Sequence, residues 1–197
     1  MCKSKLVLGF IVTLSAVAFS AVPAFAEFSS GATSGQAKFG EGTMEAGGLT
    51  LTCTSAEGEW KLPTSPSSRG ILKINKHNNC VAKSSEIKEV PATFGACEIE
   101  GKSTTKGVTK EAQVKASIVR TCTTELKVLF ITCKVDVEPE GNKELKKIKA
   151  TNENSNIALV TELEGVTTKL GGTCPGVKPT KEATSKGNGL LEGVKLV

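Results

Sequence analysis

Tyrosine is absent from this 197-residue sequence, and tryptophan and histidine each occur once. Because aromatic residues make up only 4% of the chain, we expect a core of Val, Ile, Leu and Ala. The single histidine, His77, lies in the polar run Lys76–Asn79, for which a turn is the simplest interpretation. A histidine in such a turn leaves a Ser-His-Asp site without its base, so we predict no catalytic residues.

Metal-binding patterns are missing as well. Asp136 is the only aspartate, which excludes Asp-rich calcium loops. The chain has no C-x-x-C pair and only one histidine, so it also lacks the ligand spacing of a zinc site. Only Arg69 and Arg120 are arginines, and no aromatic cluster accompanies them. We therefore predict no metal, no cofactor and no nucleic-acid partner.

Long hydrophobic runs are absent except at the start, where two lysines precede an apolar stretch over residues 6–22. The stretch leads to Ala24-Phe25-Ala26, an A-x-A cleavage pattern, so residues 1–26 are predicted to be a secretory signal peptide. We expect residues 27–197 to form a single β domain that is secreted, extracellular or associated with the cell surface, with no membrane span after cleavage. Removal of the two lysines lowers the formal net charge from +5 to +3. The remaining Lys and Glu residues are interspersed, which is typical of a solvated surface.

Seven cysteines occur, and Cys2 lies within the predicted signal peptide. In an exported chain the even remainder favours disulfides over free thiols. These six residues are Cys53, Cys80, Cys97, Cys122, Cys133 and Cys174. Counting alone leaves many connectivities open. We favour Cys53–Cys80, Cys122–Cys133 and Cys97–Cys174, because neighbouring cysteines pair easily in a meander of strands and Cys97 is then left to close the long loop.

Short runs that alternate apolar and polar residues, broken by Gly, Ser, Thr, Asn and Pro clusters, fill the rest of the chain. Leu49–Cys53 and Glu59–Leu62 are predicted to form a hairpin around a turn at residues 55–58, and residues 144–150 and 157–163 a second one. Residues 128–131 are apolar in sequence, which predicts a central strand covered on both faces. The pattern favours an all-β fold, an antiparallel β-sandwich or partly closed barrel with disulfides.

The cysteines lie in distinctive surroundings, mostly at expected strand ends and beside turn glycines. These segments are Gly47–Cys53, Asn78–Cys80, Phe94–Cys97, Ile118–Cys122, Thr132–Val135 and Thr173–Gly176. This framework resembles an uncharacterised family of small secreted β-rich, six-cysteine proteins of high-GC Gram-positive soil bacteria. The resemblance spans nearly the whole mature chain and implies an exported β fold. It implies no catalytic or binding residues, because its shared motifs are structural.

Paired carboxylates are the one catalytic option that composition leaves open. Glu98 and Glu100 share one face of an expected strand, and Glu57 and Glu59 do so if their strand extends that far. Such pairs on an exposed face usually serve solubility. We therefore predict that the protein is not an enzyme.

Two functions remain as hypotheses. The first is a structural or interaction protein of the cell surface or extracellular matrix, acting through self-association or through contact with cell wall or glycan. The alternative is an extracellular binding module for a glycan or small ligand, for which Trp60 is the only candidate stacking platform. A buried Trp60 would remove the basis of this stacking site.

Overall fold

The computed structural model describes residues 25–128, 130–139 and 145–197, which form β-strands, turns and loops without a helix. The prediction of an all-β fold with an antiparallel sheet and disulfides is confirmed. The predicted signal peptide lies outside the described residues except for Phe25 and Ala26. The strands are β1 (Phe28–Ser30), β2 (Ser34–Ala46), β3 (Leu49–Cys53), β4 (Ser55–Lys61), β5 (Arg69–Asn78), β6 (Val81–Lys83), β7 (Val90–Phe94), β8 (Cys97–Ser103), β9 (Glu111–Arg120), β10 (Cys122–Val128), β11 (Ile131–Val137), β12 (Leu145–Glu153), β13 (Asn156–Gly172), β14 (Thr180–Leu191) and β15 (Val194–Leu196).

Several pairs of consecutive strands are the two halves of one longer strand. β3 ends at Cys53 and β4 begins at Ser55, yet both halves pair with β2 in one register, Cys53 opposite Gly42 and Ala56 opposite Phe39. Shared neighbours likewise join β5 to β6, β7 to β8, β9 to β10 and β11 to β12, although the register on β13 differs between β11 and β12. The large sheet is therefore a meander of long antiparallel strands, each beside its neighbour in the chain.

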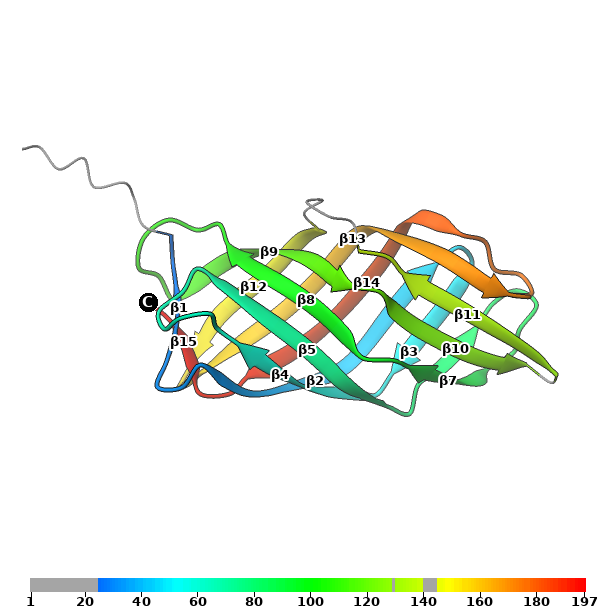
Figure 1. Cartoon of the computed structure of the whole chain (residues 1–197), viewed down its shortest axis with the longest axis horizontal. Coiled ribbons are helices and arrows are strands. Elements are labelled where there is room, and N and C mark those ends of the chain that lie inside the picture. The colour runs from blue at the N-terminus through cyan, green and yellow to red at the C-terminus, as the bar shows by residue number, and fades with distance from the viewer. Residues whose placement is uncertain (1–24, 129, 140–144) are drawn as a thin grey trace, which may run out of the picture.

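The sheet closes on itself because the last long strand, β14, pairs with the first, β2, from Leu191 opposite Ala37 to Thr184 opposite Glu45. Figure 1 shows the result, an elongated barrel with its strands strongly tilted to the long axis. Closure removes the free edges that an open sheet would present. Of the two predicted architectures, the barrel is the one observed.

Alternation along the strands decides which side chains fill the barrel. In β9, Ala112, Val114, Ala116 and Ile118 are buried and the residues between them face outward. The buried side chains form two clusters, one toward each end of the barrel. The first includes Trp60, Val114 and Leu159, and the second includes Leu49, Leu126 and Val135.

Both ends of the barrel are covered. At one end β1 pairs with β15, and Phe28, Val194 and Leu196 are buried there (Figure 1). Ala26 is also buried at this end and its N–H donates to the carbonyl of Thr105 at 2.8 Å, so a chain beginning at Glu27 lacks this contact. At the other end, the loop side chains of Ile87 and Val177 are buried against the second cluster.

Three local predictions change. Residues 55–58 are not a turn but belong to β4, and the hairpin partner of β3 is β2, joined by Gly47-Gly48. The central strand predicted at residues 128–131 is not observed. Val128 lies opposite Ile131 near the tip of the β10–β11 hairpin and Phe130 is fully exposed, while residue 129 lies outside the described residues. The hairpin of β12 and β13 is confirmed within the described residues.

Candidate functional site

A cavity of about 200 Å³ lies inside the barrel, where the two core clusters approach each other. Its wall is mainly aliphatic and aromatic. Prominent lining residues are Phe39, Met44, Leu51, Ile118, Leu159 and Leu163. A smaller space of about 60 Å³ lies toward the β1 end, and the two share Leu72, Ile99, Ile148 and Leu159.

The cavity follows from the residues that the sequence supplies to the barrel interior. The large sheet has 13 strands in the described residues, and joining the five split pairs leaves eight long strands. An eight-stranded barrel is wide enough for side chains to fill its interior or for one small ligand to occupy it. Here Gly42, Ala56 and Gly187 occupy positions around the waist, and none of them reaches far inward. With few aromatic residues to compensate, the space stays unfilled by protein.

Exposed residues border the cavity in the β2–β14 ladder. Between the pairs Gly42–Gly187 and Phe39–Gly189, two residues of β2 oppose only Asn188 of β14, which is a β-bulge. Gly40, Glu41 and Asn188 are exposed and also line the cavity. The bulge therefore thins the wall at this point.

A second weak point lies between the third and fourth long strands. β5 and β8 pair as far as Ile74 opposite Cys97, and β6 and β7 resume at Val81 opposite Pro91. The ladder is interrupted between these positions, and His77 and Phe94 stack there with ring centroids 4.7 Å apart. Both rings line the cavity.

His77 is therefore not in a turn, as the sequence suggested, but in β5 with its side chain inward. It lies opposite the buried Ala56, and cross-strand partners share a face. A register shift between Glu57 and Gly58 leaves Asn75 as an extra residue in β5. Before the extra residue, Leu72 and Ile74 face inward; after it, His77 does. Strict alternation of inward and outward residues from Leu72 would have placed His77 on the outer surface.

The imidazole of His77 has unusual surroundings. Its Nδ1 is inaccessible to solvent and has no hydrogen-bond partner among the described residues. Burial lowers the pKa of the His77 imidazole below its ordinary value, so the ring is uncharged at neutral pH. The polar residue Thr161, also on the wall, differs in this respect because its hydroxyl donates to the carbonyl of Gly187 at 3.0 Å.

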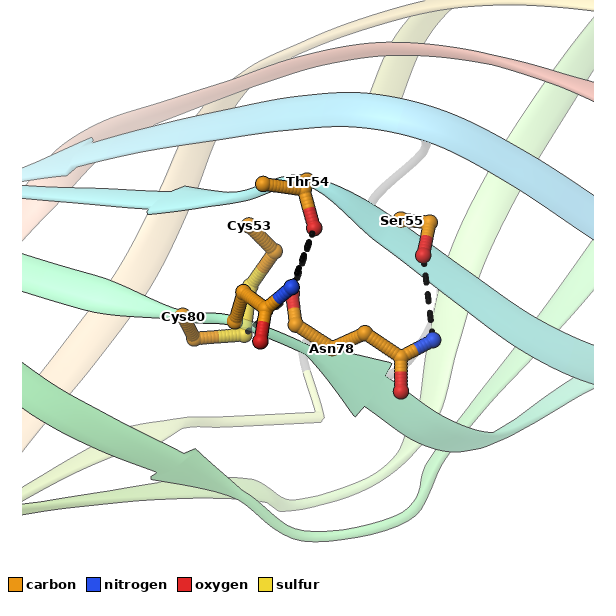
Figure 2. Close-up of a disulfide and its surroundings, with 6 residues drawn as sticks. Cys53, Thr54, Ser55, Asn78 and Cys80 are labelled. Atoms are coloured by element: carbon orange, nitrogen blue, oxygen red, sulfur yellow. Dashed lines mark hydrogen bonds between the residues drawn. A yellow bond between two sulfur atoms is a disulfide. The ribbon is translucent and has the colours of Figure 1, made fainter.

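Three disulfides join neighbouring long strands around the barrel. Cys53 pairs with Cys80, the pair expected from the sequence, with Cα atoms 4.1 Å apart. Figure 2 shows this bridge beside a side-chain hydrogen bond between the strands, from Asn78 Nδ2 to Ser55 Oγ at 3.0 Å. Asn79 Nδ2 also donates to Thr54 Oγ1, at 3.4 Å. The strands are thus fixed to each other at the bend between β3 and β4.

The other two predicted pairs are wrong. The structure joins Cys97 to Cys122 and Cys133 to Cys174. The β10–β11 hairpin explains why Cys122 and Cys133 do not meet. Its register places Cys122 opposite Val137 and Cys133 opposite Leu126, so the two sulfurs lie at opposite halves of the ladder. Three intramolecular disulfides are typical of extracellular or otherwise oxidising environments.

Trp60 does not form an exposed stacking platform. Its side chain is buried in the first cluster, 3% exposed, and its indole N–H donates to the carbonyl of Glu192 at 2.9 Å. The glycan site that the sequence suggested at Trp60 is therefore withdrawn.

The carboxylates singled out from the sequence do not converge. Glu98 and Glu100 flank the cavity-lining Ile99 and so face outward, where Arg120 and Arg69 lie 3.2 and 3.9 Å from their respective oxygens. Glu57 lies 4.0 Å from Lys76, and Glu59 lies opposite Lys73. These four carboxylates lie on the outer surface and do not form a pocket.

Within the described residues, no group of three or more His, Cys, Asp or Glu side chains could hold a metal ion. The same part of the chain contains no candidate membrane-spanning helix. Comparison with protein-family models, with curated proteins and with solved structures finds no match to this chain.

Proposed function

We propose that this protein is a secreted binding protein that holds a small apolar molecule inside its barrel and carries out no catalytic step on it. The observation that carries the proposal is the cavity of about 200 Å³ with its mainly apolar wall. Ligand sites are typically concave and lined by hydrophobic side chains with a few polar groups, and closed barrels of eight strands are a common place for them. Export is supported by the three disulfides and by the A-x-A pattern at Ala24–Ala26.

The size of the cavity indicates the size of the ligand. An engineered cavity of about 150 Å³ with a similar aliphatic and aromatic lining binds benzene. A space of about 200 Å³ therefore accommodates one six-membered ring with small substituents. Larger sugars do not fit in this volume, which moves the proposal from glycans to small apolar molecules.

Two adjacent residues of β13 provide the test. Leu159 faces inward and lines the cavity, whereas Val160 is 58% exposed on the outer surface. Leu159→Phe adds ring volume to the cavity, and Val160→Phe adds the same ring outside it. NMR titration measures the binding of p-xylene. We expect p-xylene to bind wild type and Val160→Phe equally and to bind Leu159→Phe at least about tenfold more weakly.

The comparison is valid only if both variants fold like the wild type. Circular dichroism and amide chemical shifts establish that both variants keep the barrel. Absence of p-xylene binding to the wild type at millimolar concentration refutes the proposal. Equal binding to all three proteins also refutes it, because the ligand then sits outside the cavity.

The structural or interaction role expected first from the sequence keeps one observation in its favour. Phe130 at the tip of the β10–β11 hairpin is fully exposed, and the neighbouring Ile131 is 38% exposed. An exposed aromatic ring at a hairpin tip can pack against a second protein. Phe130→Ser is expected to reduce self-association in sedimentation velocity if this role holds, and an unchanged monomer in both proteins argues against it.

A further inference from the structure

Two buried side-chain polar atoms have no hydrogen-bond partner in the described part of the chain, His77 Nδ1 and Ser103 Oγ. Only His77 belongs to the lining of the cavity of about 200 Å³. Native proteins contain few such atoms, because a buried polar group without a partner is destabilising. The imidazole is therefore the place on this wall where a polar group of a ligand gains most.

The surroundings of the imidazole restrict the chemistry of that group. Phe94 stacks on one face of the ring, and the cavity wall nearby is formed by residues such as Ile74 and Ile99. A charged ligand group beside these side chains loses its hydration and meets no opposite charge among them. The two charged residues that line the cavity, Glu41 and Lys186, lie instead in the β2–β14 ladder, and Lys186 is paired with Glu162 at 3.1 Å. The burial that lowers the pKa of His77 keeps the imidazole uncharged as well.

We infer that the cavity takes an uncharged molecule of single-ring size that carries a hydroxyl group, and that this hydroxyl pairs with the imidazole of His77. The inference rests on the function proposed above and adds the ligand class to it. A neutral imidazole has one donor and one acceptor nitrogen, and a hydroxyl both donates and accepts. A hydroxyl therefore matches the ring in either tautomer, whereas a carboxylate only accepts.

Pairing at Nδ1 requires a small movement of the protein. The nitrogen is closed to solvent in the structure, so the imidazole must turn about its Cβ–Cγ bond toward the cavity. β5 stays paired with β4 at His77, but the β5–β8 ladder has already ended at Ile74, so no β8 residue lies opposite His77 on that side. Phe94, which also lines the cavity, supplies an aromatic ring to this part of the wall.

The experiment compares two ligands of nearly the same shape, p-cresol and p-xylene, which differ in a hydroxyl against a methyl group. Affinities are measured by NMR titration for the wild type, His77→Leu and His77→Gln. We expect the ratio of p-cresol to p-xylene affinity to fall about three- to tenfold in His77→Leu. His77→Gln, whose amide can also donate and accept, is expected to keep most of the wild-type ratio.

A second readout follows the imidazole itself. In ¹⁵N-labelled wild-type protein, p-cresol is expected to shift the His77 ring nitrogen resonances, and p-xylene to leave them nearly unchanged. The His77→Leu variant must retain the wild-type circular dichroism spectrum and bind p-xylene, which shows that its cavity is intact.

Each outcome of the titrations decides a separate question. If both ligands bind and the affinity ratio is the same in wild type and His77→Leu, the inference about the hydroxyl is overturned while the proposed function stands. If neither ligand binds the wild type at millimolar concentration, the proposed function fails first. Loss of p-cresol preference in His77→Leu together with its retention in His77→Gln supports the inference.

Discussion

The indole N–H of Trp60 donates to the backbone carbonyl of Glu192 at 2.9 Å, which joins β4 to the turn between β14 and β15. The contact links residues 132 positions apart. It lies near the end of the barrel that β1 and β15 cover. We expect Trp60→Phe to lower the free energy of unfolding by about 1–3 kcal/mol, because the partly buried carbonyl of Glu192 loses its donor and the core loses ring volume. Urea denaturation followed by far-UV circular dichroism measures the change.

Glu192→Gln is the matched control for that substitution. It keeps the backbone carbonyl that Trp60 contacts and removes only the carboxylate that Lys38 Nζ reaches at 2.6 Å. Exposed ion pairs contribute little to stability, so the change is expected to stay within about 0.5 kcal/mol of wild type. Equal stability losses in the two variants would contradict the role given to the indole hydrogen bond.

The β2–β3 turn gives a second prediction. Gly47 and Gly48 have φ angles of 56° and 91°, the left-handed values that a tight hairpin turn requires. A Cβ on Gly47 would also overlap the carbonyl oxygen of Lys178. Gly47→Ala is therefore expected to cost at least about 2 kcal/mol of unfolding free energy in urea denaturation.

Gly31 is the control for Gly47. A Cβ there meets no atom within 4 Å, and its φ angle does not lie in the left-handed region. Gly31→Ala is expected to leave stability within about 0.5 kcal/mol of wild type. A Gly47→Ala protein as stable as Gly31→Ala would show that the turn tolerates a side chain.

His77 makes stability depend on pH in a defined direction. Its pKa is lowered by burial in the folded protein and takes the ordinary value of 6.5 when unfolded. Between these two values the unfolded chain binds more protons, so stability falls as the pH falls below about 6.5. We expect the wild type to lose more stability than His77→Gln between about pH 7.5 and pH 5.5.

Urea denaturation of both proteins at several pH values measures this difference. All other ionisable residues are the same in the two proteins, so their contributions cancel in the comparison. The exposed pair Glu57–Lys76 lies on the opposite face of the β4–β5 ladder and is unchanged by the substitution. Parallel pH profiles for wild type and His77→Gln would contradict the burial of the imidazole.

The sequence predicted the strand class and the disulfide cysteines because both leave local signals. Alternation in a strand such as Glu111–Arg120 is visible over ten residues, and the even set of cysteines can be counted. The hairpin tip after Val128 was missed because no Gly, Asn or Pro marks it. The pairing of Cys97 with Cys122 was missed because it depends on a register that spacing does not reveal.

The cavity could not be predicted from the sequence for a different reason. Barrel closure depends on β2 pairing with β14, two strands near opposite ends of the described chain. The unfilled volume depends on the combined size of the side chains that many strands contribute at one level of the barrel. No local sequence pattern indicates that combined size. His77 enters the wall only because an extra residue in β5 changes the phase of the strand.

Peptide mapping under non-reducing conditions tests the disulfide connectivity directly. A lysine separates each of the six cysteines from the next along the chain, so trypsin places every cysteine in a different peptide. We expect mass spectrometry to find Cys53 linked to Cys80, Cys97 to Cys122, and Cys133 to Cys174.

The Cys133–Cys174 bridge then gives a stability test of its own. It closes the longest of the three sequence separations, 41 residues, so removal of both cysteines by serine substitution is expected to cost about 2–5 kcal/mol. Replacing Cys133 alone should destabilise the protein to a similar extent, because Cys174 then has no partner sulfur within the wild-type pattern.

A peptide linking Cys122 to Cys133 would instead require the β10–β11 register to shift, since Val137 and Leu126 now lie opposite these two residues. Such a shift would slide β11 by four residues along β10, an even number, so the same side chains of β11 would still face the core. Every cross-strand pair of the hairpin would nevertheless change, and the structure would be wrong in that half of the barrel.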